Sequence, residues 1–445
     1  MKVSFTKEQL KAIRAPLEPS LVLAGAGTGK TSVMAERAIW LIDNENISPN
    51  EILGLTFTNK AALELKTRIK NKLTKKIEFL EPTVSTYHSF ALDILKNYGL
   101  SIGIDSDLQL LSETSRISLA YQTLLNTNFE IKYLDTSPRR IAQQIILLDN
   151  QMSEHNLEKS QIIEYSNKIF EEILQTKSRN DLIKLEKTLN QRIELANLVE
   201  EFRLQKLESR VIDFSDQMRF VHQLVKNNSN IKEELRQSFK AVLLDEYQDT
   251  SVIQRMILVE IFGNAHPVTA VGDPLQAIYG WRGASVSNID NFTKHFPLED
   301  GTNSKIYNLT SNFRSGLKIL EHANSISKSL REMHNAIDIL VADKEDAGDV
   351  KIGLFETSIE EALEIINQIK DLINEKKVNY KDIVILSRNT KELLPIYDLL
   401  IKNEIPAAFS GKQDLVDIPE VSEVLSYLRI LEDPTHNPSL VRILA

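Results

Sequence analysis

Cysteine is absent from the 445-residue sequence. This absence excludes disulfide bonds and cysteine-ligated zinc or iron–sulfur centres in this chain, and it fits a reducing compartment. The sequence also lacks any run approaching the roughly 18 apolar residues that are needed to cross a bilayer. Its polar N-terminus has no apolar signal segment. We therefore expect a cytoplasmic protein with no membrane partner.

Positively charged residues are fewer than negatively charged ones. The sequence has 53 Lys and Arg residues against 62 Asp and Glu residues, which gives a formal net charge of −9. Such a balance gives no support to nucleic-acid binding by overall charge, although a groove on an acidic protein can still be locally basic. The apolar fraction of 42% and the charged fraction of 26% are those of a globular protein. The length predicts roughly two to four domains, and the composition leaves the function open.

Short apolar runs and helical periodicity alternate in the first part of the chain. Residues 21–24 and 52–57 have the composition of buried strands, and residues 32–42 between them have apolar side chains at helical spacing. This order predicts parallel strands in an α/β fold. Between residues 108 and 207 the strand-like runs almost vanish. That stretch predicts a helical domain inserted into the α/β domain, built from amphipathic helices.

Strand-like runs return after this helical stretch. We expect strands at residues 241–244, 268–271, 305–309, 350–355 and 383–386, and helices over 359–374 and 421–431. A turn is expected at residues 433–434. The later strands and helices predict a second α/β unit followed by a helical tail.

A glycine-rich segment joins the first predicted strand to the first predicted helix. It reads Gly25-Ala26-Gly27-Thr28-Gly29-Lys30-Thr31. This is the Walker A pattern, in the strand–turn–helix setting that the pattern requires. Glycines let consecutive backbone N–H groups face phosphates, and the N-terminus of the helix adds its dipole. We expect this loop to bind ATP, with Lys30 reaching the β- and γ-phosphates and Thr31 holding Mg²⁺.

Two adjacent carboxylates, Asp245 and Glu246, directly follow the predicted strand at 241–244. Ligands of open α/β sheets bind at the carboxyl ends of the strands. We expect Asp245 to hold Mg²⁺ through its water shell and Glu246 to polarise the attacking water. Gln276 follows the strand at 268–271, where a neutral amide could sense the γ-phosphate. Taken alone, a glutamine on a surface loop is the simpler interpretation.

Three aromatic clusters lie where loops leave the predicted sheet. They are Phe57, then Tyr87 and His88, then Tyr279, Trp281 and Arg282. Exposed aromatic faces stack unpaired bases without regard to sequence, whereas core packing is the default for any single aromatic residue. Trp281 is the exception, because Gly280 and Gly283 around it argue against a buried strand.

A run of basic residues follows the first cluster. Its members are Lys66, Arg68, Lys70, Lys72, Lys75 and Lys76. They either line a phosphate path or form a solvated helix face.

In this order, the segments resemble the motifs of the UvrD/Rep/PcrA family of superfamily 1 DNA helicases. Residues 5–9 resemble the Q motif, 55–62 motif Ia, 85–90 motif Ib, 212–216 the aspartate–phenylalanine segment, 243–250 motif II, 271–284 motif III, and 312–315 motif IV. The resemblance implies a RecA-like P-loop motor domain with an inserted helical domain, followed by an incomplete second RecA-like domain. The implied helicase ATP-binding region is 1–315, with its core at about 1–92 and 239–305 and the insertion at about 93–238. The second domain would begin at 316–411, and a second insertion at 412–445.

The resemblance also implies roles for single residues. Gln9 would read the adenine, and Gln276 would link the γ-phosphate to bases stacked on Tyr279 and Trp281. Arg314 would act as an arginine finger supplied in cis. The DNA contacts implied by motifs Ia, Ib and III comprise Phe57, Thr58, Asn59, Tyr87, His88, Tyr279, Trp281 and Arg282. The implied activity is ATP-dependent 3′→5′ movement on single-stranded DNA and at single-strand/double-strand junctions, with repair or recombination proteins as partners.

Three departures from the family pattern bear on function. Ser32 stands where the family often has Arg, and Phe313 stands where motif IV usually has Tyr. No motif V or VI is found, which predicts a fragment or a truncated product that binds nucleotide and single-stranded DNA but unwinds little. The alternatives are a helicase–nuclease subunit, a non-motor ATP- and DNA-binding module, and a P-loop kinase or metabolic NTPase.

Overall fold

The structure is a computed structural model that describes residues 4–73, 80–104, 109–173, 179–334, 336–375, 378–409, 419–432, 434 and 437–444. The chain forms two units, Met1–Val350 and Lys351–Ala445. Lys75 and Lys76 of the basic run, and the first residue of the turn expected at 433–434, lie outside the described residues.

The first unit is organised around a parallel sheet of six strands. They are β1 (Ser20–Ala24), β2 (Ile52–Thr56), β3 (Thr83–Thr86), β6 (Ala241–Leu244), β7 (Val268–Gly272) and β8 (Lys305–Leu309). Their order across the sheet is β3-β2-β6-β7-β1-β8, and each neighbouring pair is parallel. Because β1 lies between β7 and β8, the loops that leave these three strands emerge side by side. The predicted α/β class with a parallel central sheet is confirmed.

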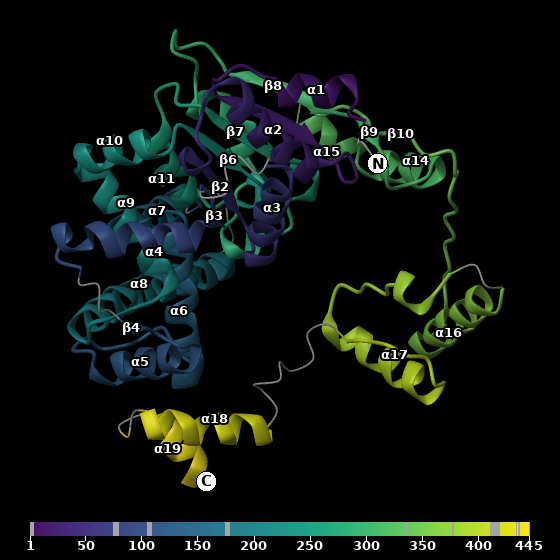
Figure 1. Cartoon of the computed structure of the whole chain (residues 1–445). Coiled ribbons are helices and arrows are strands. Elements are labelled where there is room, and N and C mark those ends of the chain that lie inside the picture. The colour runs from purple at the N-terminus through teal and green to yellow at the C-terminus, as the bar shows by residue number, and fades with distance from the viewer. Residues whose placement is uncertain are drawn as a thin grey trace. The chain divides into compact units, whose positions relative to one another are not determined.

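Helices cover both faces of the sheet, as Figure 1 shows. One face packs against α1 (Lys7–Ile13), α2 (Lys30–Asn44) and α3 (Asn59–Lys72). The other packs against α4 (Tyr87–Tyr98), α9 (Phe214–Asn227), α10 (Ser229–Ser238), α11 (Val252–Phe262), α12 (Ser287–Asp290) and α13 (Phe292–His295). Strands β1, β2, β6 and β7 are buried along their whole length. Burial on both faces explains their continuous apolar sequences.

Alternation of side chains along β1 divides the core into two layers. Leu21 and Leu23 belong to the cluster with α4 and α9, while Val22 and Ala24 belong to the cluster with α2. Successive side chains of a strand point to opposite faces. The strand therefore holds both helical layers against the same sheet and fixes where its C-terminal loop begins.

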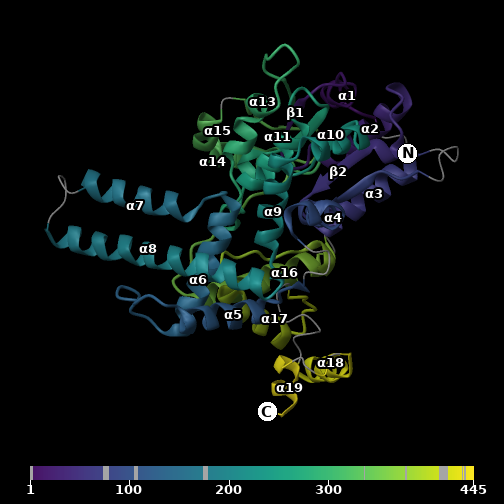
Figure 2. The same cartoon turned by 90° about the vertical axis from the view of Figure 1, so that its left-hand side faces the viewer.

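Four helices form a separate helical body with a core of its own. They are α5 (Glu113–Asn126), α6 (Pro138–Glu154), α7 (Lys159–Ile173) and α8 (Arg179–Glu208). Figure 2 shows α7 and α8 lying side by side. A short parallel pair, β4 (Gln109–Leu110) with β5 (Val211–Ile212), lies at the chain ends of this body. Since α9 and α10 share the core of the sheet, we propose residues 113–208 as the part of the predicted insertion that has an apolar core of its own.

The remainder of the first unit follows β8. Strand β9 (Ser311–Asn312) pairs in parallel with β10 (Val341–Ala342), and between them lie α14 (Leu317–Ile326) and α15 (Lys328–Met333). The Asn324 side chain donates to the backbone oxygen of Leu340 at 2.9 Å. This short segment thus folds beside the strand that precedes it.

The second unit contains α16 (Ser358–Asn374), α17 (Thr390–Lys402), α18 (Pro419–Glu432) and α19 (Asn437–Leu444). Helices α16 and α17 pack through Ile366, Ile369 and Leu400. The strands expected at 350–355 and 383–386 are wrong for the described structure, because neither segment pairs with another strand there. A strand needs a neighbour to complete its backbone hydrogen bonds, and sequence composition alone does not supply one. No helix of the described residues is long and apolar enough to cross a membrane.

Candidate functional site

The loop between β1 and α2 has the backbone of an anion-binding turn. Gly27 and Gly29 have φ angles of 79° and 86°, in the left-handed region that glycine adopts without strain. A Cβ on Gly27 would lie 2.7 Å from the Asn312 side chain and 2.8 Å from the Cβ of Arg314. Gly29 is the N-cap of α2 and provides no side-chain cap. The free N–H groups of the first helical turn are consequently directed at the loop.

A cavity of about 380 Å³ opens above this loop. Its lining consists of Ala26, Gly27, Gly29, Lys30, Thr31, Ser32, Arg68, Glu246, Gln276, Phe313 and Arg314. The structure therefore brings the predicted phosphate lysine, general base, γ-phosphate sensor and arginine finger to one space. Gly25 and Thr28 of the loop do not line the cavity, and neither does Asp245.

Lys30 and Glu246 form an ion pair in this cavity, with 2.7 Å between Nζ and Oε2. Glu246 has a left-handed backbone, with φ of 45°, which is uncommon for a residue other than glycine. The strained turn directs the Glu246 side chain across the strand ends toward the start of α2.

Asp245 is buried at the end of β6, with 5% of its surface exposed. Burial and, next, the charge of Glu246 raise the pKa of Asp245 to about 6, while Lys30 acts in the opposite direction. A carboxylate and a threonine hydroxyl are oxygen donors of the kind that Mg²⁺ prefers. Asp245 and Thr31 therefore fit a magnesium ion, which would lower the pKa of Asp245 when bound.

A chain of hydrogen bonds joins Glu246 to Gln276. The buried Gln248 amide donates to Glu246 Oε2 at 2.8 Å and accepts from the backbone N–H of Asp273 at 3.0 Å. Gln276 Nε2 in turn donates to Asp273 Oδ2 at 2.6 Å. Sequence reasoning did not give Gln248 a role, because a glutamine after an acidic pair has no chemical signature of its own.

Gln9 lies against the phosphate loop rather than in the cavity lining. Its Nε2 donates to the backbone oxygen of Thr28 at 2.9 Å, and its Oε1 accepts from the backbone N–H of Thr6 at 2.9 Å. Thr6 and Gln9 thereby form a capping box at the start of α1. In this structure both ends of the amide are engaged by the protein, so contact with adenine stays a proposal.

The segment that carries Arg314 is docked on the phosphate loop by Asn312. The Asn312 amide donates to the backbone oxygen of Ala26, and its Oδ1 accepts from the Arg314 N–H at 2.9 Å. The N–H of Phe313 donates to the oxygen of Gly27 at 2.9 Å. Asn312 is a second residue whose role was not foreseen, because its partners are distant in sequence.

Arg68 is a third residue whose place at the cavity was not foreseen. It lines the cavity from α3 and donates to Ser32 Oγ at 3.0 Å. It also pairs with Glu64 at 2.6 Å. Other members of the basic run, Lys66 and Lys70, pair with Glu81, as solvated residues on a helix face do. In the sequence, only the helical periodicity of α3 could have indicated that Arg68 lies on a different side of the helix from Lys66 and Lys70.

The aromatic clusters divide into exposed and buried members. The rings of Phe57 and Tyr279 lie 4.8 Å apart, and the Arg282 guanidinium lies 5.8 Å from the Phe57 ring and 5.5 Å from the Trp281 ring. Trp281 is 75% exposed. Thr58 caps α3, and Asn59, its first residue, is exposed beside this group. These residues form one surface at the strand ends.

Tyr87 and His88 are placed differently. Tyr87 is only 5% exposed and belongs to the core beneath the sheet, so it offers no face to a base in this structure. The His88 ring packs edge-to-face on Phe214 at 5.5 Å, and burial followed by the Arg282 charge lowers the pKa of His88 to about 4. Of this cluster, His88 alone adjoins the exposed surface through Arg282.

A glycine loop at a strand–helix junction, a carboxylate pair at the end of another strand of the same parallel sheet and a docked arginine define a P-loop nucleoside-triphosphate-binding protein of RecA-like architecture. The chain belongs to the UvrD/Rep helicase family. The UvrD/REP helicase N-terminal domain model matches residues 5–297, and the UvrD-like helicase C-terminal domain model matches residues 307–445. The family resemblance predicted from the motifs is thus confirmed, while the absence of motifs V and VI stays a prediction.

Curated relatives align with nearly the whole chain. It is 30% identical over 441 residues to the ATP-dependent DNA helicase Rep of Buchnera aphidicola, covering 99% of this chain and 63% of that protein. It is 29% identical over 441 residues to DNA helicase II of Haemophilus influenzae and 29% over 440 residues to the ATP-dependent DNA helicase PcrA of Staphylococcus aureus, covering 98% of this chain and 55% of each relative. The chain therefore spans little more than half the length of these relatives.

Proposed function

We propose that the chain is the ATP-binding portion of an ATP-dependent DNA helicase or translocase that moves 3′→5′ on single-stranded DNA in repair or recombination. The observation that carries this proposal is the chain of hydrogen bonds from Glu246 through Gln248 and Asp273 to Gln276. It ends three residues before Tyr279, in the exposed aromatic surface. A change at the γ-phosphate therefore has a short covalent and hydrogen-bonded route to the residues suited to stack bases.

In this proposal each cavity residue has a distinct task. Lys30 and Arg314 neutralise charge on the β- and γ-phosphates, and Glu246 orients and polarises the attacking water. Thr31 and Asp245 would hold Mg²⁺, which would neutralise part of the phosphate charge. Gln9 would contact the adenine after releasing one of its present partners.

The DNA side of the proposal rests on the aromatic group at the strand ends, in which Trp281 is exposed and Phe57 and Tyr279 are half-buried. Phe57, Tyr279 and Trp281 would stack bases, and the Arg282 guanidinium lies near the rings of Phe57 and Trp281. Thr58 and Asn59 would contact the DNA backbone at the start of α3, where N–H groups face outward. Single-stranded DNA and its junctions with duplex are the expected partners.

ATP hydrolysis by the chain should rise when single-stranded DNA is added, and Lys30→Ala should abolish that hydrolysis while preserving DNA binding. Partial duplexes with a 3′ or a 5′ single-stranded tail would then give the direction of travel. Hydrolysis that ignores single-stranded DNA, with no binding of it, would favour a P-loop kinase or a metabolic NTPase instead.

The activity of this chain by itself is a separate question. The positively charged residues that line the cavity are Lys30, Arg68 and Arg314, which suits them to bind the phosphates of a nucleotide. For this chain alone we expect binding of nucleotide and single-stranded DNA with little processive unwinding. Robust unwinding by the 445-residue chain would contradict this expectation. The alternative of a helicase–nuclease subunit would be tested by incubating the protein with labelled DNA and looking for cleavage.

A further inference from the structure

The last turn of α6 touches the segment that ends the exposed aromatic surface. A Cβ on Gly283 would lie 2.5 Å from Glu154 Cβ and 2.8 Å from Glu154 Cγ. Gly283 has a φ of 83° and directly follows Arg282. The helical body therefore reaches the base of the Tyr279–Arg282 loop with no room for an added methyl group.

Glu154 is enclosed at this contact. Burial raises the pKa of its carboxyl group, against the smaller effects of the Ser251 hydroxyl and the Arg282 charge. Ser251 caps α11 and forms an antiparallel bridge with Ala284 on the far side of the loop. Glu154 consequently faces both chain segments that hold the loop in place.

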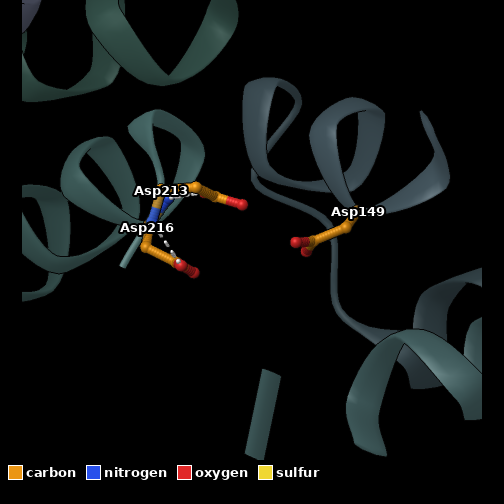
Figure 3. Close-up of side chains that lie close together, drawn as sticks. All are labelled: Asp149, Asp213 and Asp216. Atoms are coloured by element: carbon orange, nitrogen blue, oxygen red, sulfur yellow. Dashed lines mark hydrogen bonds between the residues drawn. The ribbon is translucent and has the colours of Figure 1, made fainter. Parts of the chain in front are cut away.

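One and a half turns earlier, α6 is fixed by a buried ionic cluster. Figure 3 shows the carboxylates of Asp149, Asp213 and Asp216 directed toward a common centre. The Lys206 ammonium lies among them, with its Nζ 2.8 Å, 3.1 Å and 2.7 Å from one oxygen of each in turn. All four side chains are at most 2% exposed. Three converging carboxylates have the composition of a metal site. In this cluster the Lys206 ammonium supplies the positive charge that contacts all three.

Three arginines complete the cluster at its edges. Arg203 Nε lies 2.6 Å from Asp149, Arg219 Nη2 lies 3.0 Å from Asp216, and Arg116 Nε lies 3.2 Å from Asp213. Arg203 also donates to Ser153 Oγ at 3.0 Å, next to Glu154 in sequence. Each of the three carboxylates thus faces the Lys206 ammonium and one arginine, so none of the buried negative charges lacks a partner.

The cluster joins three helices across the boundary between the helical body and the sheet. Asp149 belongs to α6, Lys206 to α8, and Asp213 and Asp216 form the capping box of α9. Helix α9 is packed on the sheet through residues such as Val221. The end of α6 is therefore held relative to the sheet, and removing one buried charge would leave its partners uncompensated.

We propose that the end of α6 is a positioning element for the Tyr279–Arg282 loop, with Glu154 as the contacting residue and the Lys206 cluster as its anchor. Through this contact the helical body sets the position in which the loop meets single-stranded DNA. This inference rests on the proposed function, since it concerns the coupling of DNA contact to hydrolysis. Glu154 acts through the loop and is not itself placed at DNA or nucleotide.

Gly283→Ala tests the contact directly, because it adds the methyl group that has no room. Stimulation of ATP hydrolysis by single-stranded DNA should fall about tenfold, since displacing a positioned group by about 1 Å costs up to about 100-fold. Hydrolysis without DNA should stay within about twofold of the unmodified chain. Gly301→Ala is the matched control, because Gly301 has a φ of 79° and nothing within 4 Å of its added Cβ.

A second substitution separates the Glu154 contact from backbone strain. Glu154→Gly removes the opposing Cβ and Cγ without straining the loop backbone, so DNA stimulation should fall in this single variant too, and combining it with Gly283→Ala should lower it no further. The loop itself can be observed by fluorescence, because the chain has 2 Trp residues and Trp40→Phe leaves Trp281 as the reporter. Gly283→Ala and Glu154→Gly should each change the Trp281 emission.

Equal DNA stimulation in Gly283→Ala and Gly301→Ala would overturn the inference, as would unchanged DNA stimulation in a folded Glu154→Gly variant. Lys206→Met offers an independent arm, read by hydrogen exchange. Protection of α6 and α9 amides should fall together there, and unchanged protection would reject the anchor. If the unmodified chain neither bound single-stranded DNA nor responded to it, the proposed function itself would have failed before any variant was compared.

Discussion

The ammonium of Lys30 lies 2.7 Å from Oε2 of Glu246, so the residue expected to hold phosphate is paired with the residue expected to activate water. Glu246 is also the acceptor of the Gln248 amide at 2.8 Å. In the proposed function, a triphosphate entering the cavity would compete with Glu246 for Lys30. If Lys30 turned to the phosphates, Glu246 would be released from this ion pair. We propose that nucleotide binding and the release of Glu246 are one event.

Glu246→Gln should preserve nucleotide binding and remove most hydrolysis. The amide cannot accept a proton, and general-base catalysis contributes about 10²- to 10⁴-fold. The loss of the Lys30 pair also frees the lysine for phosphate, so ATP affinity should be equal or higher. Binding of a fluorescent ATP analogue and steady-state hydrolysis measure the two effects. Equal weakening of binding and hydrolysis would contradict the assigned role.

Gln248→Leu should break the connection between Glu246 and Asp273 while leaving the cavity lining in place. The buried amide makes one bond to each of them, and an apolar side chain of similar size makes neither. We expect hydrolysis to fall about tenfold, as for loss of about 1.4 kcal/mol of transition-state stabilisation. The DNA-stimulated rate should fall more than the basal rate. The exposed Gln237→Leu is a control for the substitution.

Much of the nucleotide site could be predicted from the sequence because its signals are local. The glycines at 25, 27 and 29 and the apolar strand before them are adjacent in the chain, and so are Asp245 and the strand that ends before it. A parallel sheet then brings such strand ends to one edge. The predicted gathering of Lys30, Glu246 and Gln276 follows from this topology.

The residues that sequence reasoning missed depend on contacts between distant segments. Asn312 docks on Ala26, and Arg68 reaches Ser32 from another helix. Lys206 has the charge of a surface residue in an amphipathic helix, yet it is 1% exposed, because the carboxylates around it come from two other helices. No periodicity in α8 distinguishes such a lysine from a solvated one.

Which aromatic residues are exposed also depends on contacts between distant segments. Tyr87 and Trp281 both follow strands at loops, but Tyr87 begins a helix that packs on the sheet. The glycines around Trp281 keep it in a loop. In the second unit, the apolar runs at 350–355 and 383–386 have strand composition without a paired neighbour in the described residues, so local propensity alone was a poor guide there.

Trp281→Ala should weaken single-stranded DNA binding by about 1–3 kcal/mol, the contribution of one base stacked on an aromatic ring. Nucleotide affinity should stay unchanged, since Trp281 does not line the cavity. Fluorescence anisotropy of a labelled oligonucleotide measures the first effect, and ATP-analogue titration measures the second. Tyr165→Ala, an exposed aromatic residue on α7, is the matched control. DNA binding that is unaltered by Trp281→Ala, or reduced equally by both variants, would remove this residue from the proposed surface.

Acidification should destabilise the first unit through His88. Burial, then the Arg282 charge, lowers the pKa of His88 to about 4 in the folded chain, against an unfolded value near 6.5. The unfolded chain therefore takes up this proton first as the pH falls. The contribution of neutral His88 to the free energy of unfolding is fully present above pH 6.5. It is lost progressively down to pH 4, by up to about 3 kcal/mol.

Other groups act on the same pH window, so the test must be a difference between two proteins. Burial and the charge of Glu246 raise the pKa values of Asp245 and Asp249 to about 6, and their protonation favours the folded chain on acidification. In His88→Asn these carboxylates remain and the histidine does not. Denaturant unfolding at pH 8 gives the difference in free energy of unfolding that is caused by altered packing in His88→Asn. At pH 5 this difference between the two proteins should be smaller. A gap of constant size from pH 8 to pH 5 would show that His88 is protonated equally in both states, and that its ring is not enclosed beside Arg282.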